Sequence, residues 1–328
     1  MIRATKLALA ALLLLAAHDA AAQAPARVRV GVLKFGTVSW ELDVMQAHRL
    51  AAQEGIDLQL VTLASTAATT VALQGGSVDL IVTDWIWVSR QRAQGRPYVF
   101  VPYSLTVGGV LVRPDSGIQQ FADLRGKKLG VAGGPVDKSW LLLRAYARRT
   151  LGEDLAKVVE PTFGGPPLLS ELMLRGSLPA ALTYWQYGAR LKAAGMRELI
   201  SVPDVLRGLG VTAPVPLLGW AFDERWAAST RGAVIGFLRA AYAAKRILMT
   251  SDEEWMRIRP LVGTDDDKVL RATRDGFREG VPRQFGPSDV ETAEKVFEIL
   301  AQEGGEELVG NSRRLSPGTF WDGFTIAP

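Results

Sequence analysis

The chain contains the same 20-residue unit twice, 100 positions apart. GSVDLIVTDWIWVSRQRAQG occupies residues 76–95, and GSLPAALTYWQYGARLKAAG occupies residues 176–195. Seven of the twenty aligned positions are identical, including the glycine at each end and a central Thr-x-Trp. Any two β-α units can converge on glycine-ended helices, but such convergence does not explain a tryptophan at the same position in both copies. We therefore interpret the chain as a duplicated lobe.

The same offset aligns further residues and gives each copy the order β-α-β-α-β. Ser39-Trp40 matches Ser139-Trp140, so four tryptophans form the pairs Trp40/Trp140 and Trp85/Trp185. Apolar, β-branched runs predict strands, and periodic segments closed by glycine predict helices, the first of them running to Glu54. This order predicts parallel sheets covered on both faces. The strands are expected at residues 27–33, 57–63 and 78–83 in the first copy, and at 127–133, 155–161 and 179–185 in the second.

The fold class predicted is α/β, with two Rossmann-like lobes joined by a hinge of two crossings. Two extended segments, near residues 104–112 and 213–219, separate the copies and supply that hinge. The tract that follows is mostly helical, and the chain must return to the first lobe. We expect residues 27–108 plus 220–328 to form lobe one and residues 113–213 to form lobe two.

The first 22 residues are typical of a signal peptide. Arg3 and Lys6 precede an eleven-residue apolar run from Leu7 to Ala17, which is too short to span a bilayer. Small residues before Gln23 predict cleavage after Ala22; an uncleaved anchor is the alternative. The absence of cysteine excludes disulfides and a lipidated cysteine. We expect a protein of the periplasm, without a lipid anchor and not embedded in the membrane.

Composition and motifs favour binding over catalysis. The net charge of +4 comes from scattered basic residues, which argues against a nucleic-acid partner. The two histidines are His18, within the signal peptide, and His48, within an amphipathic helix. No metal-binding spacing, nucleophile elbow, phosphate loop or dinucleotide fingerprint is present, so we expect no catalytic residues, no metal and no cofactor.

Candidate site residues follow from topology, because open parallel α/β sheets bind ligands beyond the carboxyl ends of their strands. If the lobes face each other, the two Thr-x-Trp units contribute two halves of one site. Each candidate has another interpretation: the tryptophans as core, the hydroxyls as helix caps, and the acids as solvated loop residues. The predicted ligand-binding residues are Ser39, Trp40, Ser65, Thr66, Asp84, Trp85, Asp137, Ser139, Trp140, Tyr184 and Trp185.

The segments at 71–82, 121–134 and 168–191 resemble a known family. It is the family of periplasmic substrate-binding proteins of ABC transporters for nitrate, sulfonates and taurine, related to thiamine-pyrimidine-precursor binders. The resemblance implies a type II periplasmic-binding-protein fold. It also implies a monomer that captures a small solute by hinge closure, with an ABC permease and its ATPase as partners. A sensor component is one alternative, and a periplasmic enzyme of the pyrimidine-precursor branch is another.

The predicted site departs from anion-binding members of that family. It contains four tryptophans, Asp84 and Asp137, and no arginine is evident in the cleft. Tryptophan rings can stack on a planar ring or surround an ammonium group. The hydroxyls at the helix starts would suit an anion instead. The balance favours an organic nitrogenous solute, aromatic or amine, over nitrate or sulfate.

Overall fold

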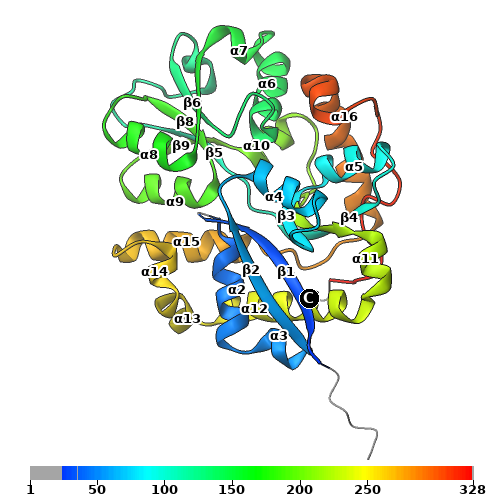
Figure 1. The fold of residues 1–328 in the computed structure, drawn as a ribbon. Helices are drawn as coiled ribbons and strands as arrows, with labels where there is room; N and C mark the ends of the chain where they lie inside the picture. Colours follow the sequence, from blue (N-terminus) through cyan, green and yellow to red (C-terminus); the bar gives the residue numbers. More distant parts are fainter. Residues whose placement is uncertain (1–23, 35, 327–328) are drawn as a thin grey trace, which may run out of the picture.

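A computed structural model describes residues 24–34 and 36–326 of the chain. The predicted signal peptide lies outside the described residues. Figure 1 shows two α/β lobes, each built on one five-stranded sheet. The sheet of lobe one has the order β2 (Ile56–Leu63), β1 (Ala26–Leu33), β3 (Leu80–Asp84), β10 (Leu218–Asp223) and β4 (Tyr98–Ser104). The sheet of lobe two has the order β7 (Glu160–Gly164), β6 (Lys128–Ala132), β8 (Ala180–Thr183), β5 (Gly109–Val112) and β9 (Arg197–Ser201).

The duplication is visible in the bounds of the elements. Helix α4 (Thr66–Gln74) and helix α8 (Pro166–Leu174) lie 100 residues apart at both ends, as do α5 (Trp85–Ala93) and α9 (Trp185–Ala193). The first glycine of each repeat, Gly76 or Gly176, has a left-handed backbone with φ of 69° or 80°. A residue with a Cβ is strained there, which explains why both copies place glycine after the helix.

The sheets are mixed, whereas the sequence predicted parallel ones. β1 pairs in parallel with β2 and β3, and β6 pairs in parallel with β7 and β8. β10 and β5 run antiparallel to both of their neighbours. Each of these two strands directly follows a crossing from the other lobe, at residues 105–108 and 209–217. The chain enters each sheet from the opposite lobe, and this reverses the strand direction.

Two local predictions differ from the structure. Residues 155–161 were expected to form a strand, but Asp154 accepts a hydrogen bond from the backbone N–H of Ala156 and caps a short helix, α7 (Leu155–Val158). The long helix expected to end at Glu54 is divided into α2 (Val38–Ala47) and α3 (Leu50–Gln53). The break falls at Arg49, whose φ of 54° is left-handed.

Lobe two contains further helices besides those of the repeat. They are η1 (Phe121–Leu124), α6 (Lys138–Leu151) and α10 (Val202–Gly208). The C-terminal tract contributes α11 (Glu224–Ser229), α12 (Arg231–Thr250), α13 (Asp252–Arg257), α14 (Arg259–Val262), α15 (Asp267–Glu279) and α16 (Pro287–Val309).

The C-terminal helices contact both lobes. Helix α12 packs on α2 and α3 of lobe one. Helix α15 packs against α9, and α16 packs against both α5 and α6, so each reaches lobe two (Figure 1). Arg148 of α6 and Glu303 of α16 form an ion pair of 3.0 Å across the second contact. The C-terminal tract therefore packs against lobe one and lobe two on both sides of their junction.

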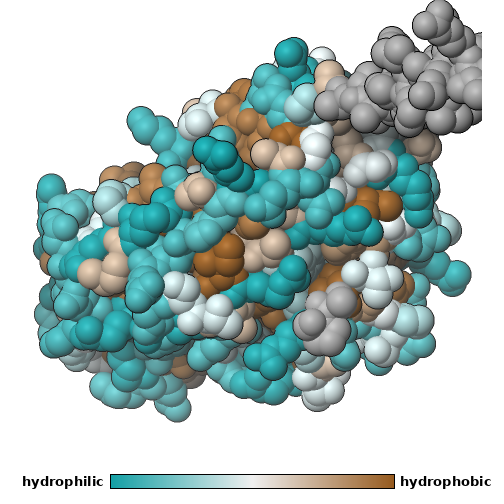
Figure 2. Space-filling model, turned by 90° about the horizontal axis from the view of Figure 1, so that it is seen from below, coloured by the Kyte–Doolittle hydropathy of each residue, from teal (hydrophilic) through white to brown (hydrophobic). Residues whose placement is uncertain are grey.

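The surface is predominantly hydrophilic on the face drawn in Figure 2, where hydrophobic residues gather in small, recessed patches. Within residues 24–34 and 36–326, no helix combines the length and the apolar character that crossing a membrane requires.

Candidate functional site

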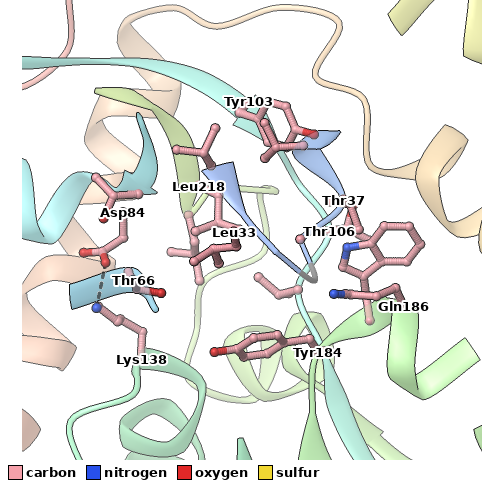
Figure 3. Close-up of a pocket in the computed structure, with 18 of the residues that line it drawn as sticks. Leu33, Thr37, Thr66, Asp84, Tyr103, Thr106, Lys138, Tyr184, Gln186 and Leu218 are labelled. Carbon is pink, nitrogen blue, oxygen red and sulfur yellow. Dashed lines mark ion pairs between the residues drawn. The ribbon is translucent and has the colours of Figure 1, made fainter. Parts of the chain in front are cut away.

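A cavity of about 210 Å³ lies between the two lobes, where β1 and β3 of lobe one face the starts of α6 and α9 in lobe two. The first crossing forms part of its wall through Thr106, Val107 and Gly108. Figure 3 shows side chains from both lobes converging on this space. The labelled wall residues are Leu33, Thr37, Thr66, Asp84, Tyr103, Thr106, Lys138, Tyr184, Gln186 and Leu218.

An ion pair bridges the lobes at one end of the cavity. Nζ of Lys138 lies 2.6 Å from Oδ2 of Asp84, with exposed fractions of 28% and 8% for the two side chains. Lys138 is the first residue of α6 in lobe two, and Asp84 ends β3 in lobe one. Burial alone would lower the pKa of the Lys138 ammonium, but the attraction of Asp84 outweighs burial and raises it. The Lys138 charge is therefore already neutralised by the opposite lobe.

Asp84 is also the N-terminal cap of helix α5. Its Oδ1 accepts a hydrogen bond of 2.8 Å from the backbone N–H of Trp87. A carboxylate at this position satisfies a free N–H group of the first turn. Both oxygens of Asp84 are thus occupied within the described structure.

Asp137 is the other carboxylate on the cavity wall. Its Oδ1 accepts hydrogen bonds from the backbone N–H groups of Ser139 at 3.0 Å and Trp140 at 3.2 Å, which caps α6. Burial raises the pKa of Asp137 to about 6, although the Lys138 charge and the two N–H groups act in the opposite direction. At pH 7 this site therefore keeps a carboxylate in an environment that disfavours its charge.

Two buried hydroxyl groups on the lobe-one wall have no hydrogen-bond partner among the described residues. They belong to Thr83 at the end of β3 and Tyr103 near the end of β4. Behind Tyr103 lies a buried ion pair between Lys245 and Glu41, and the Lys245 ammonium stands 3.6 Å from the centre of the Tyr103 ring. Burial raises the pKa of the Tyr103 phenol well above its ordinary value, so it stays a neutral hydrogen-bond donor.

Six of the eleven predicted site residues line the cavity, and five do not. Those on the wall are Thr66, Asp84, Asp137, Ser139, Tyr184 and Trp185. Off the wall, Ser39 donates a hydrogen bond to the carbonyl oxygen of Gly36, and the exposed Ser65 caps α4 by accepting from the N–H of Ala68. The other three are tryptophans.

The expectation that four tryptophans surround one cleft is not met, because three are buried in hydrophobic cores. Trp40 packs edge-on against Trp255, and its indole N–H donates to the carbonyl of Leu261. Trp140 packs edge-on against Phe163. Trp85 is fully buried, and its N–H donates to the carbonyl of Pro216 in the second crossing. Large rings at helix starts bury more apolar surface by turning inward.

Trp185 alone of the four lines the cavity. It packs edge-on against Trp40 of the opposite lobe, with ring centres 6.2 Å apart. It also borders a second cavity of about 550 Å³ behind the first crossing, and the two cavities share Thr106, Val107, Gly108 and Trp185. These four residues form the partition between the two spaces.

Sequence reasoning missed several wall residues. Lys138 stands between the predicted residues Asp137 and Ser139, and Gln186 directly follows Trp185. The sequence showed that both residues lie next to predicted site residues, but it did not show the direction in which their side chains point. Thr37, Tyr103 and Leu218 come from a helix start and two strands whose positions on the wall depend on how the crossings are paired. Among the described residues, no three acidic or histidine side chains gather into a metal-binding group.

Comparisons with known proteins support the fold. The alkanesulfonate-binding protein SsuA from Xanthomonas axonopodis pv. citri, solved with MOPS bound, matches with a TM-score of 0.71 and 19% identity, over 92% of this chain and 99% of its own. The periplasmic aliphatic sulphonate binding protein SsuA from Escherichia coli matches with a TM-score of 0.71 and 19% identity, over 90% and 98%. The desulfurization enzyme DSZB matches with a TM-score of 0.58 and 14% identity, over 85% of this chain and 92% of its own.

These matches confirm the two-lobe fold class expected from the sequence. No curated protein sequence matches the chain. A family model described as NMT1/THI5 like matches residues 52–241, which is more than half of the 328 residues and spans parts of both lobes. The chain therefore belongs to the NMT1/THI5-like family.

Proposed function

We propose that this chain is an extracytoplasmic solute-binding protein of an ABC importer, which captures a small organic solute between its two lobes. The observation that carries the proposal is the cavity itself, whose wall is built from both lobes. A solute in that space would contact Thr66 and Tyr103 on one side and Tyr184 on the other. Binding energy would then go directly into holding the lobes together.

Closure about a hinge is the proposed mechanism. Within the part of the chain that the structure describes, only the crossings 105–108 and 209–217 connect the two sheets along the backbone. Rotation about these segments would open the cavity, and a solute that contacts both walls would favour the closed arrangement. The ion pair between Lys138 and Asp84 and the edge contact between Trp40 and Trp185 would form only when the lobes meet.

The remaining parts of the proposal concern location and partners. The similar structures include proteins named as periplasmic and sulfonate-binding. We extend this to a periplasmic location after removal of residues 1–22, an ABC permease with its ATPase as partner, and a monomer. A sensor component would use the same closure and differ only in the protein on which the closed form docks.

The test uses residues 23–328, purified, with small-angle scattering and thermal unfolding over a panel of amines, pyrimidines, alcohols and alkanesulfonates. A solute present at a hundred times its dissociation constant should add ~2.7 kcal/mol to the free energy of unfolding. The same solute should reduce the radius of gyration. A tightly bound solute that leaves the scattering curve unchanged would contradict closure.

A catalytic role is the second candidate, because one protein with a similar fold is named a desulfurization enzyme. His48 is the one histidine within residues 24–34 and 36–326, and it faces Glu254 at 3.2 Å, outside the cavity wall. Ser139 and Asp137 line the cavity, but Asp137 accepts from the Ser139 backbone N–H. We therefore favour binding, and recovery of chemically unchanged solute after prolonged incubation is the expected result.

A further inference from the structure

We infer that the inter-lobe cavity binds a small organic cation and discriminates against free anions. The charged nitrogen of the cation donates a hydrogen bond to the carboxylate of Asp137. This inference rests on the proposed function and names its substrate class. It differs from the expectation drawn from the sequence, because neither the ring of tryptophans nor Asp84 is available to the solute.

The charges on the wall are the first argument. Among the described residues that line the cavity, the charged side chains are Asp84, Asp137 and Lys138. Lys138 and Asp84 neutralise each other at 2.6 Å. Lys138 also stabilises the Asp137 carboxylate, but one cation faces two carboxylates, so the wall carries one negative charge more than positive at neutral pH.

The bonding of Asp137 is the second argument. Its Oδ1 serves the two N–H groups of α6, whereas its Oδ2 accepts no hydrogen bond from the described residues. A carboxylate oxygen that accepts nothing from the protein forms its strongest hydrogen bond with a positively charged nitrogen. The carboxylate is therefore oriented by the helix and still open to one strong contact.

The helix starts around the carboxylates give the third argument. An anion in a cavity of this kind would bind free N–H groups at helix N-termini. At α6 those groups already donate to Asp137, at α5 the Trp87 N–H donates to Asp84, and at α4 the Ala68 N–H donates to Ser65. α2 and α9 also begin at the cavity wall and have no side-chain cap, so their N–H groups remain free for an acceptor oxygen of a solute, neutral or anionic.

The rest of the wall suits the body of such a cation. Tyr184 supplies an aromatic face, and Leu33 and Leu218 supply apolar contact opposite it (Figure 3). Trp185 also lines the cavity. Aromatic faces attract ammonium groups. The hydroxyl of Thr83 is buried on the same wall without a hydrogen-bond partner among the described residues, and buried polar groups are ordinarily paired.

The experiment compares three probes of nearly the same shape by calorimetry at pH 7.5: benzylammonium, benzyl alcohol and benzenesulfonate. Benzylammonium should bind at least tenfold more tightly than benzyl alcohol, and benzenesulfonate should bind more weakly than both. Asp137→Asn should lower the affinity for benzylammonium tenfold or more and leave benzyl alcohol unchanged. Asparagine remains a good helix cap, so this variant is expected to fold.

Asp223→Asn is the matched control. Asp223 caps α11 by accepting from the backbone N–H groups two and three residues ahead, as Asp137 does in α6, but it lies off the cavity wall. Its replacement should change no probe affinity. The inference is overturned if benzenesulfonate binds best, if benzylammonium does not bind at millimolar concentration, or if Asp137→Asn leaves benzylammonium binding unchanged.

Scattering separates this failure from failure of the proposed function. If benzenesulfonate or benzyl alcohol compacts the protein and benzylammonium does not, the substrate class is wrong and solute capture stands. If no solute of any charge compacts the protein, both the cation inference and the proposed solute capture are contradicted.

Discussion

Removing the ion pair that bridges the cavity should both destabilise the protein and open it. Lys138→Met would leave the Asp84 carboxylate in place, still capping α5, but without its cation. Asp84→Asn would keep the cap, because asparagine serves there as well, and would leave the Lys138 ammonium unpaired. The double variant removes both charges together.

The expected magnitude follows from the burial of the two side chains. Breaking a fully buried pair by deleting one partner costs about 3–5 kcal/mol, whereas exposed pairs contribute about 0–1 kcal/mol. Asp84 is almost fully buried and Lys138 keeps about a quarter of its surface, with 8% and 28% exposed. We therefore expect about 2 kcal/mol for each single variant and a coupling energy of about 1–2 kcal/mol in the double-mutant cycle.

Urea unfolding followed by circular dichroism measures the cycle, and small-angle scattering without ligand measures the opening. A loss of about 1.4 kcal/mol from the closed form is a tenfold change in the ratio of closed to open molecules. Lys138→Met should therefore have a larger radius of gyration than the parent. Lys192→Met is the control, since the pair of Lys192 with Glu198 lies within lobe two at 2.9 Å and is more exposed.

The reasoning would be refuted by additive single effects, with a coupling below about 0.5 kcal/mol, or by unchanged scattering of Lys138→Met. In either case the 2.6 Å contact would be an incidental surface pair and not a bond between the lobes. An equally large effect of Lys192→Met would show that charge deletion alone explains the change.

Three further predictions use the same unfolding assays. Gly108→Ala should cost more than about 2 kcal/mol, because its Cβ would lie 1.6 Å from the carbonyl oxygen of Thr183, whereas Gly134→Ala meets nothing within 4 Å and should change stability by less than about 0.5 kcal/mol. Trp85→Ala should cost about 3–5 kcal/mol, since the ring is fully buried, while Trp185→Ala should cost less and weaken solute binding more, which calorimetry would show. Asp137→Asn should raise the free energy of unfolding at pH 7–8 by about 1–2 kcal/mol. The pKa of Asp137 is about 6 in the folded protein and ~3.9 in the unfolded chain, so the folded protein binds more protons between these pH values. The ionised Asp137 therefore lowers stability at neutral pH, this loss is regained as the pH falls through 6, and the advantage of the variant should vanish near pH 4. An advantage that is the same at pH 4 and pH 8 would contradict the last of these.

Local patterns in the sequence predicted most elements of the fold. The bounds of α4 and α5 recur in α8 and α9 at the offset of 100 that the repeat gives. Caps and glycines act over three or four residues, so they are visible in sequence. Strand pairing is decided by distant residues, and nothing local in 218–223 reveals that this segment enters the first sheet between β3 and β4. The antiparallel direction of β10 and β5 was missed for that reason.

The site was predictable to the level of loops and not of side chains. Segments following β3, β6 and β8 were expected to face one space, and six predicted residues line the cavity; their contact with a ligand stays a prediction. The direction of each side chain depends on which apolar surface competes for it. Trp140 turns toward Phe163 in its own lobe, whereas its neighbours Ser139 and Lys138 stay on the wall. A pattern of residue types carries no information about that competition.

The C-terminal tract, which has no repeat, explains why the two Thr-x-Trp units have different surroundings. Both Trp85 and Trp185 are the first residue of a helix that follows a strand. In lobe one, Phe297 of α16 and Phe320 pack on Trp85 at 6.4 and 6.1 Å and take it into the core. In lobe two, α15 reaches Trp185 through Gly276, where a Cβ would stand 3.2 Å from the indole ring, and one side of that ring stays on the cavity. The duplication supplied two equivalent positions, and the unrepeated helices buried one of them in the core and left the other facing the cavity.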